Sequence, residues 1–211
     1  MTPTQSFFMR PQGGGWLILC GGQADDAIAA RAAALVQQAG PLAVLAPSAE
    51  AREAAEARLA ECGAVCGLPG EIVILGSPSG DEGLGEAAMI VIPDTSSAAE
   101  LAKTIEESGF GESLLMALED GAVVLSEGRS SEALGEVIEA EELAAGCGWL
   151  RQAVIQSHHA AGMACLAILN RPTLYRLGLG EHAALALGPQ GQVEVWGEPA
   201  PIVTLGTAWT R

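Results

Sequence analysis

Short apolar runs alternate along this chain with longer stretches in which apolar residues recur every three or four positions. The short runs predict buried strands, at residues 16–20, 42–46, 71–75, 88–92 and 122–126. The longer stretches predict amphipathic helices, at residues 25–38, 49–62 and 97–107. Strands that alternate with helices favour a parallel sheet with helices on both faces.

The C-terminal part has a different pattern. Residues 183–187 and 192–196 are two apolar runs separated by Gly188-Pro189-Gln190-Gly191, which predicts a hairpin. A last strand is expected at 202–205, so we expect an antiparallel addition at the sheet edge. The predicted fold is therefore a flavodoxin-like α/β sandwich of three layers, with a mostly parallel central sheet and a C-terminal antiparallel hairpin. We expect one domain over residues 1–211, with residues 1–14 as a flexible lead-in.

Composition and charge limit the cellular environment and the classes of partner that we expect for this protein. The 49% apolar content is spread over short runs, none close to the roughly 18 apolar residues of a membrane span, so we expect a soluble protein. The first residues do not resemble a secretion signal, which favours the cytoplasm. Ten Lys and Arg against 26 Asp and Glu give a net charge of −16, which disfavours nucleic acid and anionic membranes as partners. The charge could favour a cationic substrate, but solubility alone also explains it.

The five cysteines argue against a disulfide framework. Their number is odd and the chain is long enough to fold without disulfide bonds, so we expect reduced thiols. Cys62 and Cys66 have near-ligand spacing, but no second Cys or His pair completes a tetrahedral zinc site. We therefore expect no metal.

A turn between a predicted strand and a predicted helix carries the first candidate for chemistry. Residues 122–126 are the strand, Glu127-Gly128-Arg129-Ser130 is the turn, and residues 131–142 have helical composition. This is the setting of a nucleophile elbow, in which the Ser130 hydroxyl would react and the backbone N–H of Ser131 would help to hold an oxyanion. The alternative is a serine that only caps the helix.

Four segments of the chain resemble the cyanophycinase and dipeptidase E family of serine peptidases. Residues 128–133 resemble that family's Gly-Thr-Ser-Ala-Gly-Ala turn, and residues 148–158 resemble its segment that ends in Asp-Gln-His. Residues 161–172 resemble the helix that follows, and residues 177–185 resemble Gly-Ile-Asp-Glu-Asp-Thr-Ala-Leu. The resemblance is strongest between about residues 121 and 196.

The resemblance implies a Ser-His-Glu triad. Ser130 would be the nucleophile, His158 the general base and acid, and Glu181 the carboxylate that orients the imidazole, a division of labour that is chemically coherent. Arg129 would contact an acidic group of the substrate or lie exposed on the turn. The family implies no cofactor, a homodimer, and a small peptide substrate such as an aspartyl dipeptide or the β-aspartyl-arginine unit of cyanophycin. His159 and His182 are interpreted as surface or packed histidines.

The sequence departs from the family's pattern at three places. Glu132 stands where the serine turn has a second glycine, Gln156-Ser157 replaces Asp-Gln, and Pro93-Asp94-Thr95-Ser96 replaces a Gly-Gly-Asp/Asn-Gln loop. Because Pro93 has no N–H, a second oxyanion donor would have to be Asp94 or a neighbour. We expect Glu132 to restrain catalysis with its carboxylate, or else to point to solvent and favour the helix dipole. Two functions stay open: an active serine peptidase or amidohydrolase, and a catalytically silent relative with a binding or assembly role.

Overall fold

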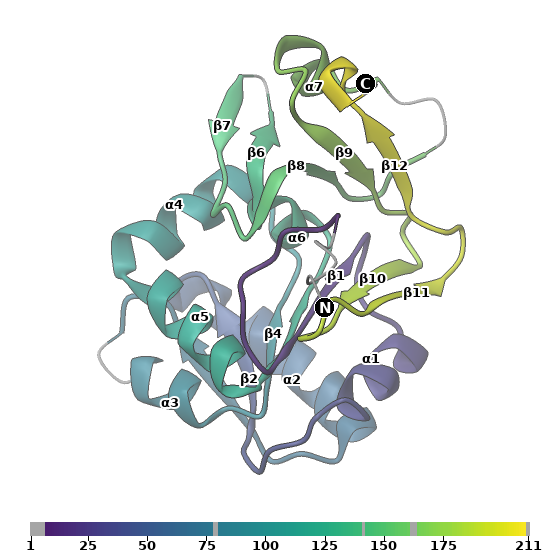
Figure 1. Cartoon of the computed structure of the whole chain (residues 1–211). Coiled ribbons are helices and arrows are strands. Elements are labelled where there is room, and N and C mark those ends of the chain that lie inside the picture. The colour runs from purple at the N-terminus through teal and green to yellow at the C-terminus, as the bar shows by residue number, and fades with distance from the viewer. Residues whose placement is uncertain (1–6, 78–79, 141, 161–163, 210–211) are drawn as a thin grey trace.

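A seven-stranded sheet forms the centre of the computed structural model, which describes residues 7–77, 80–140, 142–160 and 164–209. Its strand order is β11-β10-β1-β5-β4-β2-β3 (Figure 1). The strands are β1 (Trp16–Cys20), β2 (Leu42–Ala46), β3 (Gly70–Ile74), β4 (Met89–Ile92), β5 (Val123–Ser126), β10 (Ala183–Leu187) and β11 (Val193–Gly197). The five strands from β1 to β3 in this order are parallel, whereas β10 and β11 form the predicted antiparallel hairpin beside β1.

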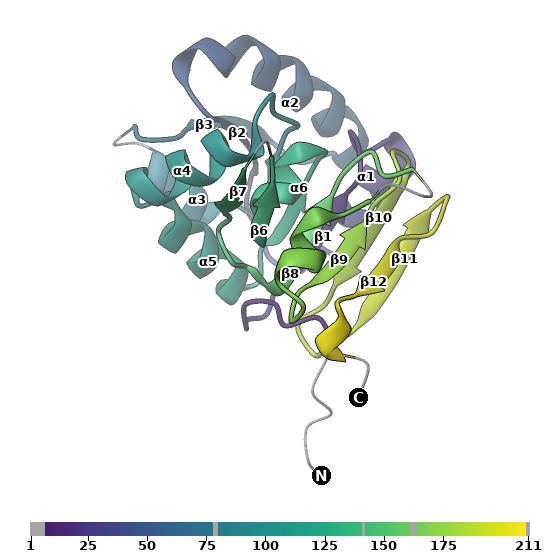
Figure 2. The same ribbon diagram turned by 90° about the horizontal axis from the view of Figure 1, so that it is seen from above.

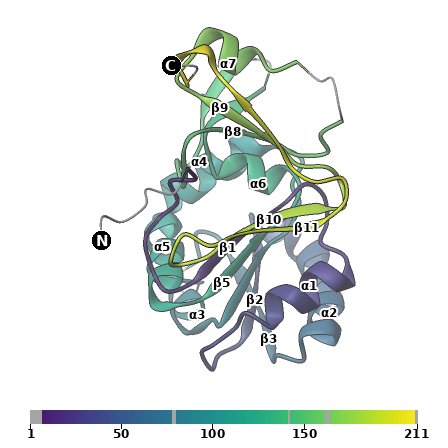
Figure 3. The same cartoon turned by 45° about the vertical axis from the view of Figure 1, so that its right-hand side comes forward.

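Helices cover both faces of this sheet (Figure 3). Helices α1 (Asp26–Ala33) and α2 (Arg52–Cys66) lie on one face, with the short 3-10 helix η1 (Ala49–Ala51) before α2. Helices α3 (Gly80–Glu86), α4 (Ala98–Ser108) and α5 (Phe110–Asp120) lie on the other. Successive side chains of β1 point to opposite faces of the sheet. Ile18 lies in the apolar core under α1 and α2, whereas Leu17 and Leu19 lie in the core under α3, α4 and α5. The flavodoxin-like sandwich that the sequence predicts is therefore confirmed.

A second sheet of five strands, in the order β12-β9-β8-β6-β7, packs against the first (Figure 2). Its strands are β6 (Gly135–Glu139), β7 (Leu143–Ala145), β8 (Leu150–Gln156), β9 (Tyr175–Gly178) and β12 (Ile202–Leu205). Helix α7 (Leu166–Asn170) joins β8 to β9, and the 3-10 helix η2 (Thr207–Trp209) follows β12. Buried residues of β8 and β9 join the same apolar cluster as those of β1 and β10.

Two predictions about this region are wrong. The helix expected over residues 131–142 is only α6 (Arg129–Ala133), and β6 begins two residues later. Val137 and Ile138 are buried in β6, and a side chain on Gly135 would lie 3.1 Å from Ala153 O of the neighbouring strand, so pairing with β8 overrides helical composition. The strand at 202–205 exists, but it pairs with β9 in the second sheet instead of extending the first.

Some predictions fall on residues outside the described part of the chain. These are residues 1–6 of the expected lead-in and residues 161–163 of the segment that resembles the family's helix. Within the described part, no helix is long and apolar enough to cross a bilayer.

Candidate active site

Three strand ends meet where the sequence predicts the site. In the register of the sheet, Ser126 at the end of β5 lies beside Leu19 of β1 and Ile92 of β4. The segments that follow these strands, which begin at Gly21, Pro93 and Glu127, therefore share one edge. Open α/β sheets bind their ligands at this carboxyl edge.

The sharp turn between β5 and α6 is made at Gly128. Its backbone has φ 51° and ψ −129°, a conformation that L-residues with a side chain rarely adopt. Its N–H donates to Gly22 O (3.2 Å), which joins the turn to the segment after β1. In a nucleophile elbow the reactive side chain stands on the strained residue between strand and helix. In this chain that residue is a glycine.

The carboxylate of Asp94 fills the space that a side chain at position 128 would need. A Cβ on Gly128 would lie 2.3 Å from Asp94 Oδ1 and 2.4 Å from Asp94 Cγ. Asp94 Oδ1 is held there by the backbone N–H groups of Arg129 (2.7 Å) and Thr95 (2.9 Å). Asp94 was expected to offer an oxyanion donor, but its side chain brings a negative charge to this position, which would repel a developing oxyanion.

Ser130 lies one residue inside α6, and its side chain is buried. Its hydroxyl donates to Pro93 O (2.5 Å), and its N–H donates to Glu127 O (3.0 Å). Among the hydrogen bonds of the described residues, none joins Ser130 to His158. The predicted pair therefore occupies the same end of the sheet without the contact that base activation needs.

Ser131 is also committed to other partners. Its N–H, the expected oxyanion donor, donates to Gly128 O (3.0 Å) inside the first turn of α6. Its buried hydroxyl lies 2.9 Å from both Cys20 O and Ser126 O. These contacts fix α6 to the ends of β1 and β5, which is a structural role.

His158 follows β8 and faces Asp94. Its backbone has φ 47°, its N–H donates to Gly21 O (2.8 Å), and its Nε2 lies 3.8 Å from Asp94 Oδ2. The imidazole is 44% exposed and the Asp94 side chain 41%, so both are open to a ligand. The histidine predicted from the sequence is thus at the site. Its Nε2 faces the carboxylate of Asp94, whereas the Nε2 of a catalytic base would face the hydroxyl of the nucleophilic serine.

Glu181 and Arg129 lie at the margin of this cluster. Glu181 is exposed, and its Cγ lies 3.0 Å from where a Cβ on Gly22 would be. No hydrogen bond between Glu181 and His158 occurs in the described part of the chain. Arg129 is exposed and donates from Nη1 to Ser96 O (2.6 Å). The geometry therefore gathers all the predicted residues at one edge but does not assemble them into a hydrogen-bonded triad.

The sequence did not predict the buried ion pair between Arg58 and Glu127, which lies next to the turn. Glu127 is 1% exposed, and its carboxylate accepts from Arg58 Nη2 (2.5 Å) and Nε (3.1 Å) and from the Ala24 N–H (3.0 Å). Burial raises the pKa of the Glu127 carboxyl, while the hydrogen bonds and charge of Arg58 oppose that rise. A glutamate directly after a strand predicted to be buried was the available signal, since such a residue needs a cation when it is buried itself.

No metal centre is evident in the parts of the chain that the structure describes, where no three His, Cys, Asp or Glu residues cluster suitably. Burial raises the pKa of the Cys62 thiol to about 12 and that of the Cys147 thiol to about 11. Both thiols are therefore poor nucleophiles near neutral pH.

Comparison with known proteins identifies the fold. The sequence matches no model of a protein family, and no curated protein matches it significantly. Among solved structures, a peptidase from an acI-B1 Actinobacterium is 14% identical, over 92% of this chain and 93% of that chain, with a TM-score of 0.74. A putative peptidase E protein from Listeria monocytogenes EGD-e is 13% identical, over 88% of this chain and 99% of that chain, with a TM-score of 0.60. The chain therefore has a peptidase E-like fold.

Proposed function

We propose that this chain binds a small peptide at the carboxyl edge of the first sheet without cleaving it. The observation that carries this proposal is the pairing of Gly128 with Asp94. The residue of the turn with positive φ has no side chain, and the carboxylate of Asp94 lies where that side chain would be. A covalent mechanism needs a nucleophile at this point, next to the imidazole of His158.

The ligand that suits this edge carries a positive charge. Asp94 and His158 are open to solvent, Glu181 is exposed nearby, and the whole chain has a net charge of −16. Negative side chains gathered on an already negative surface raise the local concentration of cations. The ammonium or guanidinium group of a small peptide would pair with Asp94, with the backbone of the peptide over the Gly128 turn.

Hydrolysis through Ser130 is the second candidate. It is favoured by the peptidase-like fold and by His158, which reaches the same edge of the sheet. On this reading the chain is a serine peptidase or amidohydrolase of aspartyl or β-aspartyl dipeptides or cyanophycin-like peptides. The Ser130 hydroxyl would have to leave Pro93 O, and the Asp94 side chain would have to turn away from His158.

A fluorophosphonate probe separates the two candidates, because it labels an activated serine whatever the substrate. The proposal predicts no labelling of the wild-type protein under conditions that label an active serine hydrolase. Labelling that disappears in Ser130→Ala and in His158→Ala would refute the proposal and establish the second candidate. Titration with a lysine- or arginine-containing dipeptide should show binding that Asp94→Asn weakens about ten-fold.

Placing a serine at position 128 tests directly whether Gly128 occupies the nucleophile position of the turn. Gly128→Ser alone would collide with the Asp94 carboxylate, so it is combined with Asp94→Ala. The double variant should gain fluorophosphonate labelling at position 128, with His158 as the base. The matched control is Gly128→Ala with Asp94→Ala, which carries the same backbone strain, about 1–3 kcal/mol, but no hydroxyl. If both folded variants stay unlabelled, position 128 is not the nucleophile position of the turn.

A further inference from the structure

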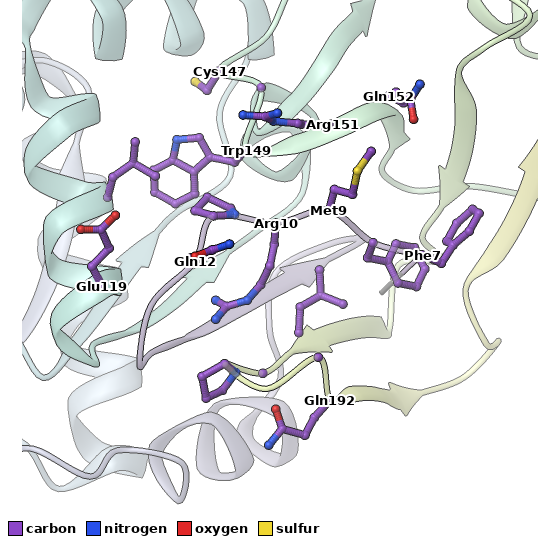
Figure 4. Close-up of a pocket in the computed structure, with 18 of the residues that line it drawn as sticks. Phe7, Met9, Arg10, Gln12, Glu119, Cys147, Trp149, Arg151, Gln152 and Gln192 are labelled. Atoms are coloured by element: carbon purple, nitrogen blue, oxygen red, sulfur yellow. The ribbon is translucent and has the colours of Figure 1, made fainter. Parts of the chain in front are cut away.

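A cavity of about 1070 Å³ lies away from the candidate active site. It is formed by the N-terminal segment from Phe7 to Gln12, the end of α5, the start of β8 and the turn between β10 and β11 (Figure 4). Leu187 at its wall pairs with Leu17 near the start of β1, whereas the candidate active site adjoins Cys20 at the end of that strand. The two sites are therefore separated by about 10 Å along the strand.

Backbone contacts hold the N-terminal segment on both sides of Arg10. Met9 O accepts from the Arg151 N–H (3.1 Å), and the N–H groups of Gly14 and Gly15 donate to Glu119 O and Leu118 O at the end of α5 (both 2.9 Å). Gly13 has φ +143°, and a Cβ there would lie 2.4 Å from Glu119 Cα. The segment is thus packed closely against α5, which fixes the position of Arg10.

The half-buried side chain of Arg10 lines the cavity. Figure 4 shows its side chain extending from the N-terminal segment toward the turn that carries Gln192. Nη2 donates to Gly13 O (3.0 Å), but Nη1 is buried and has no hydrogen-bond partner among the described residues. Arg10 also makes no ion pair with any part of the chain that the structure describes. Burial lowers the pKa of this guanidinium.

A half-buried cation without an anionic partner is less stable than a paired one, and a carboxylate is the group that matches the guanidinium fork. The rest of the lining suits an apolar body, since Phe7, Met9, Leu187 and Trp209 surround the space. Glu119 is the acidic residue of the lining and Arg151 is a second basic one, in a protein with 26 acidic and only ten basic residues. The cavity is therefore locally favourable to an anion on a surface that is otherwise negative.

We propose that this cavity binds a small organic carboxylate with an aromatic or aliphatic body, whose carboxylate pairs with Arg10. The volume is slightly above the usual range for small-molecule sites, so it has room for an acylated amino acid. Phe7 and Trp209 pack against the apolar body of the ligand, and Arg10 makes the site selective for a negatively charged ligand. This site takes an anion, in contrast to the cation proposed for the Asp94 edge.

The test uses N-acetyl-L-phenylalanine and its neutral analogue N-acetyl-L-phenylalaninamide with the full chain. Isothermal titration calorimetry should show that the acid binds at least ten-fold more tightly than the amide. Arg10→Met should abolish that preference, whereas Arg151→Met, which removes a charge at the exposed margin, should lower affinity for the acid about two-fold. Asp94→Asn should leave binding of the acid unchanged, because that residue belongs to the other site.

Three results would overturn this assignment. They are equal affinities for acid and amide, equal losses in Arg10→Met and Arg151→Met, and no binding of the acid at about 10 mM, a concentration above the Kd of weak specific ligands. Thermal unfolding controls for the fold of each variant. If Arg10→Met lowers Tm strongly, Arg10→Lys replaces it, because a lysine keeps the charge but lacks the bidentate fork and should still lose about ten-fold in affinity.

Discussion

The carboxylate of Glu132 is bound by Ser157, the residue directly before His158. Glu132 Oε1 accepts from the Ser157 N–H (2.9 Å) and from the Ser157 hydroxyl (2.6 Å). The side chain therefore points from α6 toward the end of β8. The carboxylate that crowds the turn belongs to Asp94, so the expectation that Glu132 restrains catalysis from beside the turn finds no support in this geometry.

Glu132→Ala should destabilise the protein by about 1–3 kcal/mol, because it leaves the N–H of the nearly buried Ser157 without an acceptor. Glu132→Gly should cost about 1 kcal/mol more through helix propensity. Neither variant should gain hydrolase activity toward aspartyl dipeptides. Urea unfolding measures the stability.

Glu132→Gln is the matched control for these variants, because it keeps an acceptor oxygen and should lose less than about 1 kcal/mol. The NMR signals of the His158 ring should shift in Glu132→Ala and stay close to wild type in Glu132→Gln. A Glu132→Ala protein as stable as the wild type would contradict the anchoring role.

Arg58→Met should destabilise the protein by about 3–5 kcal/mol near pH 7, because it leaves the Glu127 carboxylate buried without its cation. Arg58→Met with Glu127→Gln should recover much of this loss, since a neutral amide can still accept from the Ala24 N–H. Arg52→Met removes the exposed partner of Glu56 and should cost less than about 1 kcal/mol. Chemical denaturation of the three variants compares them, and equal losses in the single and double variants would argue against a buried charge.

The loss in Arg58→Met should also depend on pH. The folded state raises the pKa of Glu127 and so binds this proton more tightly than the unfolded chain does. Stability from this group therefore falls as pH rises from the ordinary carboxyl value of about 4.3 through the raised pKa. Removing Arg58 raises that pKa further, so the deficit should be smaller at about pH 5 than at about pH 7.5. A deficit that is constant with pH would exclude ionisation of Glu127 as its cause.

Gly21→Ala should destabilise the protein by about 3 kcal/mol through overpacking. A Cβ on Gly21 would lie 2.0 Å from Gly180 O and 2.5 Å from Leu179 O, which are backbone atoms that cannot turn away. Gly63→Ala is the opposite case, because Gly63 lies in α2 with nothing within 4 Å of a Cβ. It should raise stability by up to about 1 kcal/mol. Thermal unfolding should show a lower Tm for Gly21→Ala and a higher Tm for Gly63→Ala. An unchanged Tm in Gly21→Ala would mean that the segment after β1 can move.

The sequence by itself determined most of the first sheet. The apolar runs at Trp16–Cys20 and Leu42–Ala46 become strands with the predicted bounds, and the helix expected over residues 97–107 forms as α4, with bounds that differ by one residue. The bounds of these elements depend on neighbouring residues, so the apolar periodicity suffices to predict them. The same local rules failed after Ala133, where the buried contacts of β6 with β8 outweigh a helical propensity of less than about 1 kcal/mol per residue.

The sequence also located the turn after β5 and selected His158, but only the tertiary structure decided what stands there. A Gly-x-Ser pattern specifies only residue types, whereas the positive φ of Gly128 and the burial of Ser130 arise from the contacts around the turn. Asp94 meets Gly128 and His158, and Arg58 meets Glu127, because strand ends far apart in the chain converge at one edge. Local patterns carry no information about which distant side chain will fill a given space, and close packing in the folded state makes that choice.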